Sequence, residues 1–205
     1  MIKTQFIPKT AKGRRPAIPM IPEYITIHSP GHISTAQNEA DNVCNNNPDL
    51  KVSFHYAVDD KDRIQVLPTT ETAWHAGDDL GTGNMKSIGI EICEGGDRAK
   101  ALMNAVELVK ELMIAYKIDR NHVARHKDWS GKNCPRILIN PAYIKNGMNW
   151  DWFLSRLTPA KEHWAAPHLR SLISKGLIRS PEAHSDLDKP ITKGELFALL
   201  DRLSK

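Results

Sequence analysis

Ser87-Ile-Gly-Ile-Glu-Ile-Cys93 is the stretch that decides the fold, because isoleucines alternate along it with polar or small residues. A strand turns successive side chains to opposite faces, so the isoleucines would bury one face and Glu91 would lie on the other. Turn residues at 59–62 and a further apolar alternation at 63–67 predict a β-hairpin. The same strand pattern occurs in two other stretches: Tyr24-Ile-Thr-Ile-His28 and Val52-Ser-Phe-His-Tyr-Ala-Val58.

Helices are expected between and after these strands. Residues 35–44 predict one helix, capped by Ser34 or Thr35. Arg98–Tyr116 predicts a longer one, because its apolar residues recur at steps of three and four and would lie on a sheet. Strands that alternate with helices predict an α/β fold, with a central mixed β-sheet flanked by helices.

Length and composition limit the remaining possibilities. The 205 residues allow one well-buried domain and a small extra element. The pattern changes near Thr158, so we expect a catalytic domain at 1–157 and a helical element at 161–205. No apolar run is long enough for a membrane span, and the first residues lack the apolar core of a secretory signal. We therefore expect no membrane partner and synthesis in the cytoplasm without a signal peptide. Because the net charge is only +4 and the basic residues are mostly scattered, we expect no nucleic-acid partner either.

His126-Lys-Asp-Trp-Ser-Gly-Lys-Asn-Cys-Pro135 is the most informative segment for function. It holds an imidazole and a thiol eight residues apart, in an expected loop whose small and turn-forming residues would let both fold inward. Zinc accepts nitrogen and sulfur ligands, and a catalytic zinc site has three protein ligands and a water. His28, at the end of a strand, is placed to supply the third ligand. Zn²⁺ held by His28, His126 and Cys134 would activate water for amide hydrolysis.

Five stretches, taken together, resemble the zinc-dependent N-acetylmuramoyl-L-alanine amidases of bacteriophage endolysins and Bacillus-type autolysins. This family is distantly similar to phage T7 lysozyme and to the peptidoglycan recognition proteins. The resemblance implies cleavage of the amide bond between N-acetylmuramic acid and the L-alanine of the peptidoglycan stem peptide. The stretches follow the family's order: Tyr24–His28, Val52–Asp59, Trp74–Asp78, Gly83–Cys93 and His126–Pro135.

The resemblance also implies roles for single residues. The family's strand-end histidine and the histidine and cysteine of its late loop bind zinc, in agreement with the ligands inferred above. A glutamate in the Ser-Ile-Gly-Ile-Glu strand activates water, which implies this role for Glu91. A lysine two residues before the cysteine stabilises the oxyanion, which implies this role for Lys132. We expect substrate contacts from His55, His75 and Trp74; support of the metal ligands is the alternative for the histidines, and a core position for the tryptophan.

Two positions depart from the family's pattern. The family usually has Asn-Thr after its first zinc histidine, whereas this chain has Ser29-Pro30, so the rim of the site should differ there. In the branch of T7 lysozyme a tyrosine precedes the histidine of the second strand, and Phe54 stands at that place here. Phe54 cannot transfer a proton, which leaves more of the acid–base work to Glu91.

The final segment predicts two amphipathic helices, the second begun by a capping box of Thr192 and Glu195. This segment is similar to a single S-layer homology motif, which implies docking onto a secondary cell-wall polymer through residues 161–205. The alternative is a helical pair that packs on the catalytic domain or forms a homodimer, because so short a segment buries too little surface to be stable alone.

The expected function is that of a phage or prophage endolysin, which acts on peptidoglycan after its release from the cytoplasm. One alternative is a non-catalytic peptidoglycan-binding module of the recognition-protein type. Such modules commonly lack the cysteine ligand, whereas Cys134 is present here. The other alternative is an amidase for soluble muropeptides, which would need no segment for docking on the wall.

Overall fold

The structure is a computed structural model that describes residues 2–45, 49–157, 194 and 197. The chain divides into two units, Met1–Thr158 and Pro159–Lys205. All strands and helices named below belong to the first unit. The two helices expected within 161–205 lie outside the described residues, apart from Gly194 and Phe197.

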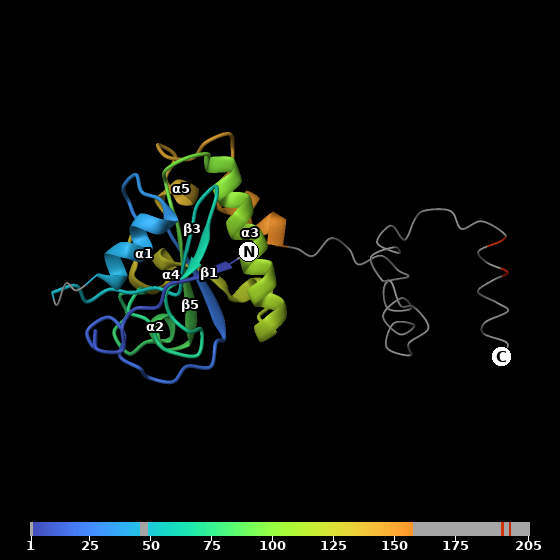
Figure 1. Cartoon of the computed structure of the whole chain (residues 1–205). Helices are drawn as coiled ribbons and strands as arrows, with labels where there is room; N and C mark the ends of the chain where they lie inside the picture. The colour runs from blue at the N-terminus through green and yellow to red at the C-terminus, as the bar shows by residue number, and fades with distance from the viewer. Residues whose placement is uncertain (1, 46–48, 158–193, 195–196, 198–205) are drawn as a thin grey trace. The chain divides into compact units, whose positions relative to one another are not determined.

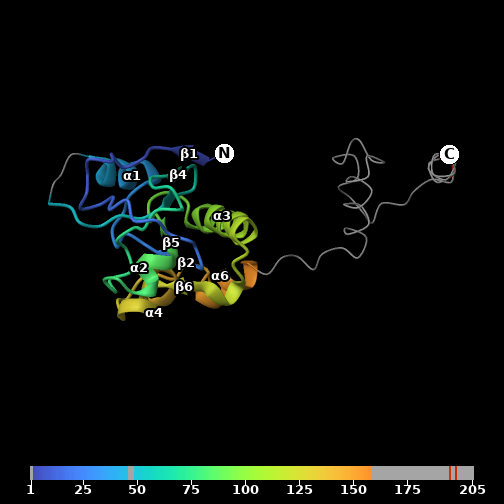
Figure 2. The same cartoon turned by 90° about the horizontal axis from the view of Figure 1, so that it is seen from below.

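A six-stranded mixed sheet forms the centre of the first unit, in the order β1-β4-β3-β5-β2-β6. The β3–β4 hairpin is antiparallel, and the other four described pairs are parallel. Figure 2 shows β1 at one edge of the sheet and β6, with α4 close by, at the other. The α/β fold with a central mixed sheet is therefore confirmed. The strands are β1 (Ile2–Thr4), β2 (Tyr24–His28), β3 (Tyr56–Val58), β4 (Arg63–Gln65), β5 (Ser87–Ile92) and β6 (Val123–Arg125).

Helices cover both faces of the sheet, with α1 on one side and α3 on the other (Figure 1). Thr35 caps α1 as expected, because its hydroxyl accepts a hydrogen bond from the backbone N–H of Asn38. The bounds of α3 are those expected from its apolar periodicity. Among the described residues, no helix is both long and apolar enough to cross a membrane. The helices are α1 (Ala36–Cys44), α2 (Thr82–Lys86), α3 (Arg98–Tyr116), α4 (His126–Ser130), α5 (Arg136–Ile139) and α6 (Trp150–Leu157).

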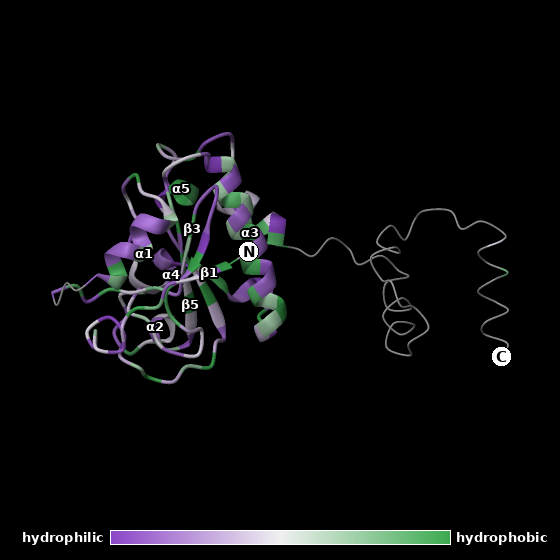
Figure 3. Ribbon diagram, viewed as in Figure 1, coloured by the Kyte–Doolittle hydropathy of each residue, from purple (hydrophilic) through white to green (hydrophobic). Residues whose placement is uncertain are grey.

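Two apolar cores lie on opposite faces of the sheet. The larger core packs β2 and β5 against α3 and α6, and it contains the three isoleucines of β5, all with 0% exposure. The smaller core packs α1 against β3 and β4. Figure 3 shows how the apolar residues concentrate in the central strands. Because the isoleucines occupy the α3 face, Gly89 and Glu91 turn to the opposite face.

Apart from the two strands of the hairpin, the short elements were not expected from the sequence. Strands β1 and β6 have three residues each, too few to show an alternation. The expectation of a loop throughout 126–135 is wrong in its first half, because His126 begins helix α4 directly after β6. The carboxylate of Asp128 accepts a hydrogen bond from the backbone N–H of Arg125 at 2.8 Å and so caps this helix.

The larger core supplies a test of the packing of α6. Phe153 is fully buried, and its ring stacks on Trp150 with the centroids 5.8 Å apart. Phe153→Ala should lower the free energy of unfolding by about 3–5 kcal/mol, because it removes apolar contacts and leaves a cavity. Urea unfolding of the full chain measures this change.

Ile114→Ala is the control, because its side chain on α3 is 81% exposed. This variant should stay within about 0.5 kcal/mol of the parent chain. Equal unfolding free energies for the two variants would contradict the packing described for α6.

Candidate metal centre

The parallel pairing of β2 with β5 sets the geometry of the site. Its register places His28 beside Glu91 and Thr26 beside Gly89. Paired residues of neighbouring strands turn their side chains to the same face of the sheet. The imidazole and the carboxylate therefore meet at the carboxyl end of two parallel strands, the edge at which open α/β sheets usually bind ligands.

Three potential metal ligands converge at this edge. His28, His126 and Cys134 are all buried, and their donor atoms lie within 4.8 Å of one another. Nδ1 of His28 is 3.0 Å from Nδ1 of His126 and 3.9 Å from Sγ of Cys134. Zinc bonds of about 2.0–2.1 Å to nitrogen and about 2.3 Å to sulfur put the donors of a tetrahedral site about 3.3–3.6 Å apart. The observed distances lie on either side of that spacing, so the donor set fits zinc.

The protonation of these groups also suits a metal. Burial lowers the pKa of His28 well below its usual value, and it lowers the pKa of His126 to about 4, so both rings are neutral. Burial raises the pKa of the Cys134 thiol to about 12, while the backbone N–H of Ser29, 3.4 Å from Sγ, opposes this rise. A metal binds neutral imidazole directly and displaces the thiol proton. The set is thus ready for a cation that stabilises the thiolate.

Each of the two histidines has a hydrogen-bond partner inside the protein besides the other potential ligands. Nε2 of His28 lies 2.9 Å from Nδ1 of His75, and Nε2 of His75 lies 3.2 Å from the carbonyl oxygen of Ser87. Because a carbonyl accepts only, His75 donates from Nε2 and accepts the proton of His28 at Nδ1. Nδ1 of His28 is then free of a proton and faces the metal position. The ring of His126 is likewise hydrogen-bonded to the backbone carbonyl of Ala76.

His55 lies behind His75, with the two ring centroids 6.0 Å apart, and it is fully buried. Its Nδ1 accepts a hydrogen bond from the backbone N–H of Gly89 at 2.9 Å. Its Nε2 donates to the carbonyl oxygen of Glu71 at 2.8 Å. Both nitrogens are therefore used inside the protein. Of the two roles expected for His55 and His75, this geometry favours support of the metal ligands over contact with a substrate.

Glu91 faces the pocket beside His28. Its Oε2 is buried and has no hydrogen-bond partner among the residues that the structure describes. Burial, and after it the nearby charge of Glu39, raises the pKa of Glu91 to about 8, although the charge of Lys132 opposes this rise. Buried carboxylate oxygens are usually hydrogen-bonded, so an oxygen without a partner is suited to receive a proton from a bound water.

Lys132 lies exposed on the segment between α4 and Cys134. Its charge lowers the pKa of Glu91 and of all three potential ligands, which places it close to each of them. The structure thus brings the two catalytic residues expected from the sequence to the same site as the three potential metal ligands.

A pocket of about 890 Å³ opens over the site, a volume typical of ligand sites. Half-buried Trp74 lines it, so the expected substrate contact is possible there. Ser29 and Pro30 also line it, at the rim where this chain departs from the family. Exposed apolar side chains, of Val52 and Leu80, stand beside these polar groups.

The sequence did not point to two of the polar residues in the pocket. Glu39 lies in the first turn of α1, with its side chain 9% exposed and Oε1 3.0 Å from Nε2 of His32. Asn84 lies in α2 and is 3% exposed. Neither stands at the end of a strand or at a metal-ligand spacing, so the pattern gave no reason to select them.

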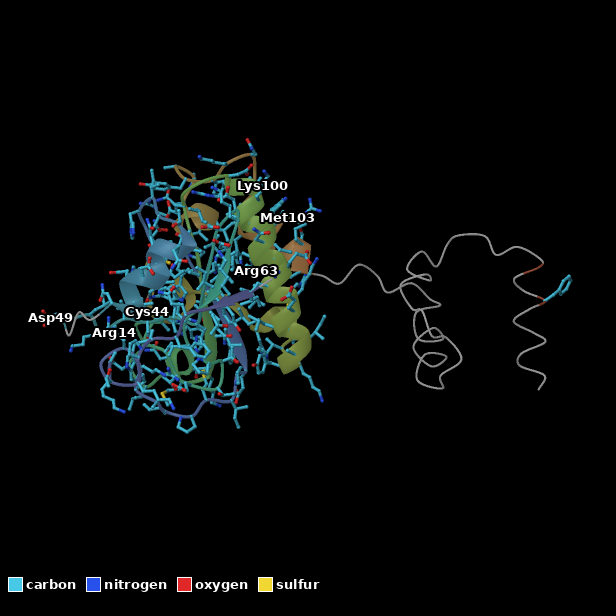
Figure 4. The ribbon with its side chains drawn as sticks, in the orientation of Figure 1. Arg14, Cys44, Asp49, Arg63, Lys100 and Met103 are labelled. Atoms are coloured by element: carbon cyan, nitrogen blue, oxygen red, sulfur yellow. The ribbon has the colours of Figure 1, made fainter. Side chains whose placement is uncertain are left out.

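The remaining two cysteines lie outside the site. Figure 4 labels Cys44 at the end of α1, and its half-buried thiol donates to the carbonyl oxygen of Gln5. Cys93 is fully buried in the smaller core. The structure therefore separates the single cysteine of the metal centre from the other two.

The domain thus has an α/β fold with two histidines and a cysteine at the carboxyl edge of its sheet. A family model described as N-acetylmuramoyl-L-alanine amidase matches residues 18–137. The chain belongs to this family.

Two amidases of Bacillus subtilis (strain 168) are among the relatives. XlyA is 44% identical over 151 residues, which cover 72% of this chain and 48% of XlyA. CwlH is 43% identical over 171 residues, which cover 78% of this chain and 64% of CwlH. The chain therefore spans about half to two thirds of the length of these relatives.

Solved structures agree with the fold. The catalytic domain of XlyA matches with a TM-score of 0.69 and 42% identity, over 77% of this chain and 99% of that chain. PlyL matches with a TM-score of 0.68 and 39% identity, over 77% of this chain and 96% of that chain.

Gly89 supplies a test of the support around His28. A Cβ at this position would lie 2.9 Å from Cγ and Nδ1 of His75. Gly89→Ala should therefore displace the ring that orients His28, lower the unfolding free energy by about 1–3 kcal/mol and weaken zinc binding. Urea unfolding and zinc titration of the metal-free chain measure the two effects.

Gly147→Ala is the matched control. Gly147 has a φ of +70° and open space around its Cα, so alanine there costs about 1–2 kcal/mol through backbone strain alone. Zinc affinity should be unchanged in this variant. Equal zinc affinities of the Gly89 and Gly147 variants would contradict the role given to His75.

Proposed function

We propose that this chain is a zinc-dependent N-acetylmuramoyl-L-alanine amidase that cleaves the bond between N-acetylmuramic acid and the L-alanine of the stem peptide. The observation that carries the proposal is the convergence of His28, His126 and Cys134 within 4.8 Å. Beside them lies Oε2 of Glu91, which has no hydrogen-bond partner in the part of the chain that the structure describes. Membership of the amidase family and the names of the relatives support the choice of substrate.

The reaction divides among a few side chains. Zinc, when bound by the three ligands, would polarise the amide carbonyl and lower the pKa of its water to about 7. Glu91 would take a proton from the attacking water and return it to the amine of L-alanine as that amine leaves. Lys132 would stabilise the negative charge that develops on the carbonyl oxygen. The register of β2 with β5 supports this division, because it holds the carboxylate of Glu91 next to His28.

The proposal also covers the domain boundaries, the role of the C-terminal segment and the setting in which the chain acts. We propose a catalytic domain at 1–157, and a helical element at 161–205 that docks on a secondary cell-wall polymer or forms a homodimer. Action on the wall after release from a cell infected or lysogenised by a phage is the proposed setting. Cys134, buried within the ligand set, favours catalysis over a non-catalytic binding module.

Glu91→Gln tests the catalytic role. Glutamine has nearly the same shape but cannot take up the proton, so activity should fall by about 10²–10⁴-fold while one zinc per chain stays bound. The assay compares the release of L-alanine amino groups with the release of reducing ends from purified cell walls.

The parent chain should release amino groups and no reducing ends. New reducing ends would indicate a glycosidase, and no release from walls or soluble muropeptides would indicate a binding module. Release from soluble muropeptides alone would favour the muropeptide amidase. Full activity of Glu91→Gln would contradict the role of Glu91.

Lys132→Met tests the stabilisation of the oxyanion. Removal of one such charge should lower kcat by about 10²–10³-fold with little change in KM, because the interaction forms chiefly in the transition state. Lys127→Met, at an exposed position on α4, is the matched control and should keep the parent kcat. An equal kcat for both variants would exclude Lys132 from the reaction.

A further inference from the structure

The side chain of Asn84 fixes a short backbone segment by hydrogen bonds. This segment supplies a hydrogen-bond partner to each of the two histidine ligands. Oδ1 of Asn84 accepts hydrogen bonds from the backbone N–H groups of His75 and Ala76, each at 2.8 Å. Its Nδ2 donates to the carbonyl oxygen of Asp79 at 2.9 Å. These bonds fix the backbone of two adjacent residues against α2.

Each of these two residues contacts a different ligand. The ring of His75 accepts the Nε2 proton of His28 at 2.9 Å, and the carbonyl of Ala76 is hydrogen-bonded to the ring of His126. A displacement of this short segment would therefore rotate both imidazoles. Such partners of metal-binding histidines fix the tautomer and the orientation of the ring.

The backbone of Asn84 is itself fixed by hydrogen bonds. The carboxylate of Asp78 accepts hydrogen bonds from the backbone N–H groups of Gly83, at 2.7 Å, and of Asn84, at 3.1 Å. Helix α2 ends at Lys86 and strand β5 begins at Ser87 without an intervening loop. Ser87 also supplies the carbonyl that accepts from His75. The amide of Asn84 is thus tied to the strand that carries Glu91.

We propose that Asn84 is a positioning residue, which sets the zinc affinity of the site by fixing the short segment that orients His28 and His126. The inference rests on the proposed zinc site. A purely structural role for Asn84 would instead lower the stability of the chain and leave the affinity of the folded protein for zinc unchanged.

Asn84→Ala in the full chain is the direct test. The loss of both acceptor contacts should weaken zinc binding by about 10–100-fold, measured by competition with a chromogenic chelator. The visible absorption spectrum of the Co²⁺-loaded protein should change, because it reports the geometry of the ligands. In the wall assay kcat should fall while KM stays close to that of the parent.

Asn104→Ala is the matched control. The amide of Asn104, on α3, donates to the backbone carbonyl of Asp59 at 2.9 Å and does not line the pocket. Its loss removes a similar hydrogen bond elsewhere in the same unit. Zinc affinity and the Co²⁺ spectrum should match those of the parent chain, even where urea unfolding of the metal-free protein shows a loss of stability.

Asn84→Asp keeps the test decisive if the alanine variant does not fold. Aspartate retains the acceptor oxygen and loses the donation to Asp79, so its zinc affinity should fall between those of the parent and the alanine variant. Parent-like affinity in Asn84→Ala, or an equal loss in Asn104→Ala, would overturn the inference while leaving the zinc site in place. Failure of the parent chain itself to bind zinc would overturn the proposed function as well.

Discussion

β2 and β5 hold their register through the isoleucines that they bury on the α3 face of the sheet. A slip of one residue would turn these side chains to the opposite face and expose the apolar set. The same slip would carry His28 and Glu91 away from the pocket, since both lie on the face opposite to the isoleucines. The core and the site are therefore fixed by one constraint. Replacement of apolar residues far from the pocket could therefore displace the potential ligands, because it would disturb this register.

The site itself is a cluster of buried imidazoles, each of which has a hydrogen-bond partner inside the protein. Burial lowers the pKa of His55 to about 4 and that of His75 to about 3, so the supporting rings are neutral like the ligands. A buried polar ring without partners would be costly, and the carbonyls of Glu71 and Ser87 remove that cost. Neutral rings place no positive charge beside an incoming cation. The arrangement thus combines a stable interior with a set of donors that suits a metal ion.

Phe54 stands where the branch of T7 lysozyme has a tyrosine, and its position is consistent with the proposed proton transfer by Glu91. Phe54 is 5% exposed, packs in the smaller core and also lines the pocket. A phenyl ring there excludes water from one wall and contributes no proton. The carboxylate of Glu91, with its oxygen unpartnered among the described residues, is then the group placed to exchange protons with the substrate.

Much of the fold could be predicted from the sequence, because β2, β5 and α3 carry strong periodic patterns. The hairpin, the cap of α1 and the convergence of the three ligands were also predictable from turn residues and ligand spacing. The burial of Oε2 of Glu91 was not predictable, since the alternation gives the face of a strand but not what covers that face. The hydrogen-bond partners of His55 and His75, and the hydrogen bonds of the Asn84 side chain, depend on contacts between different segments and could not be predicted. Strands β1 and β6 are formed by their neighbours in the sheet, and neither has an alternating pattern of its own.

In the proposed metal centre, two imidazoles and one thiolate of this chain bind a single zinc ion. X-ray absorption at the zinc edge of the full chain, loaded with one equivalent of metal, tests it most directly. We expect one sulfur at about 2.3 Å and nitrogen or oxygen neighbours at about 2.0–2.1 Å from the zinc, and we expect the sulfur to be lost in Cys134→Ser. A zinc shell without sulfur in the parent chain, or a chain that retains no zinc, would contradict it.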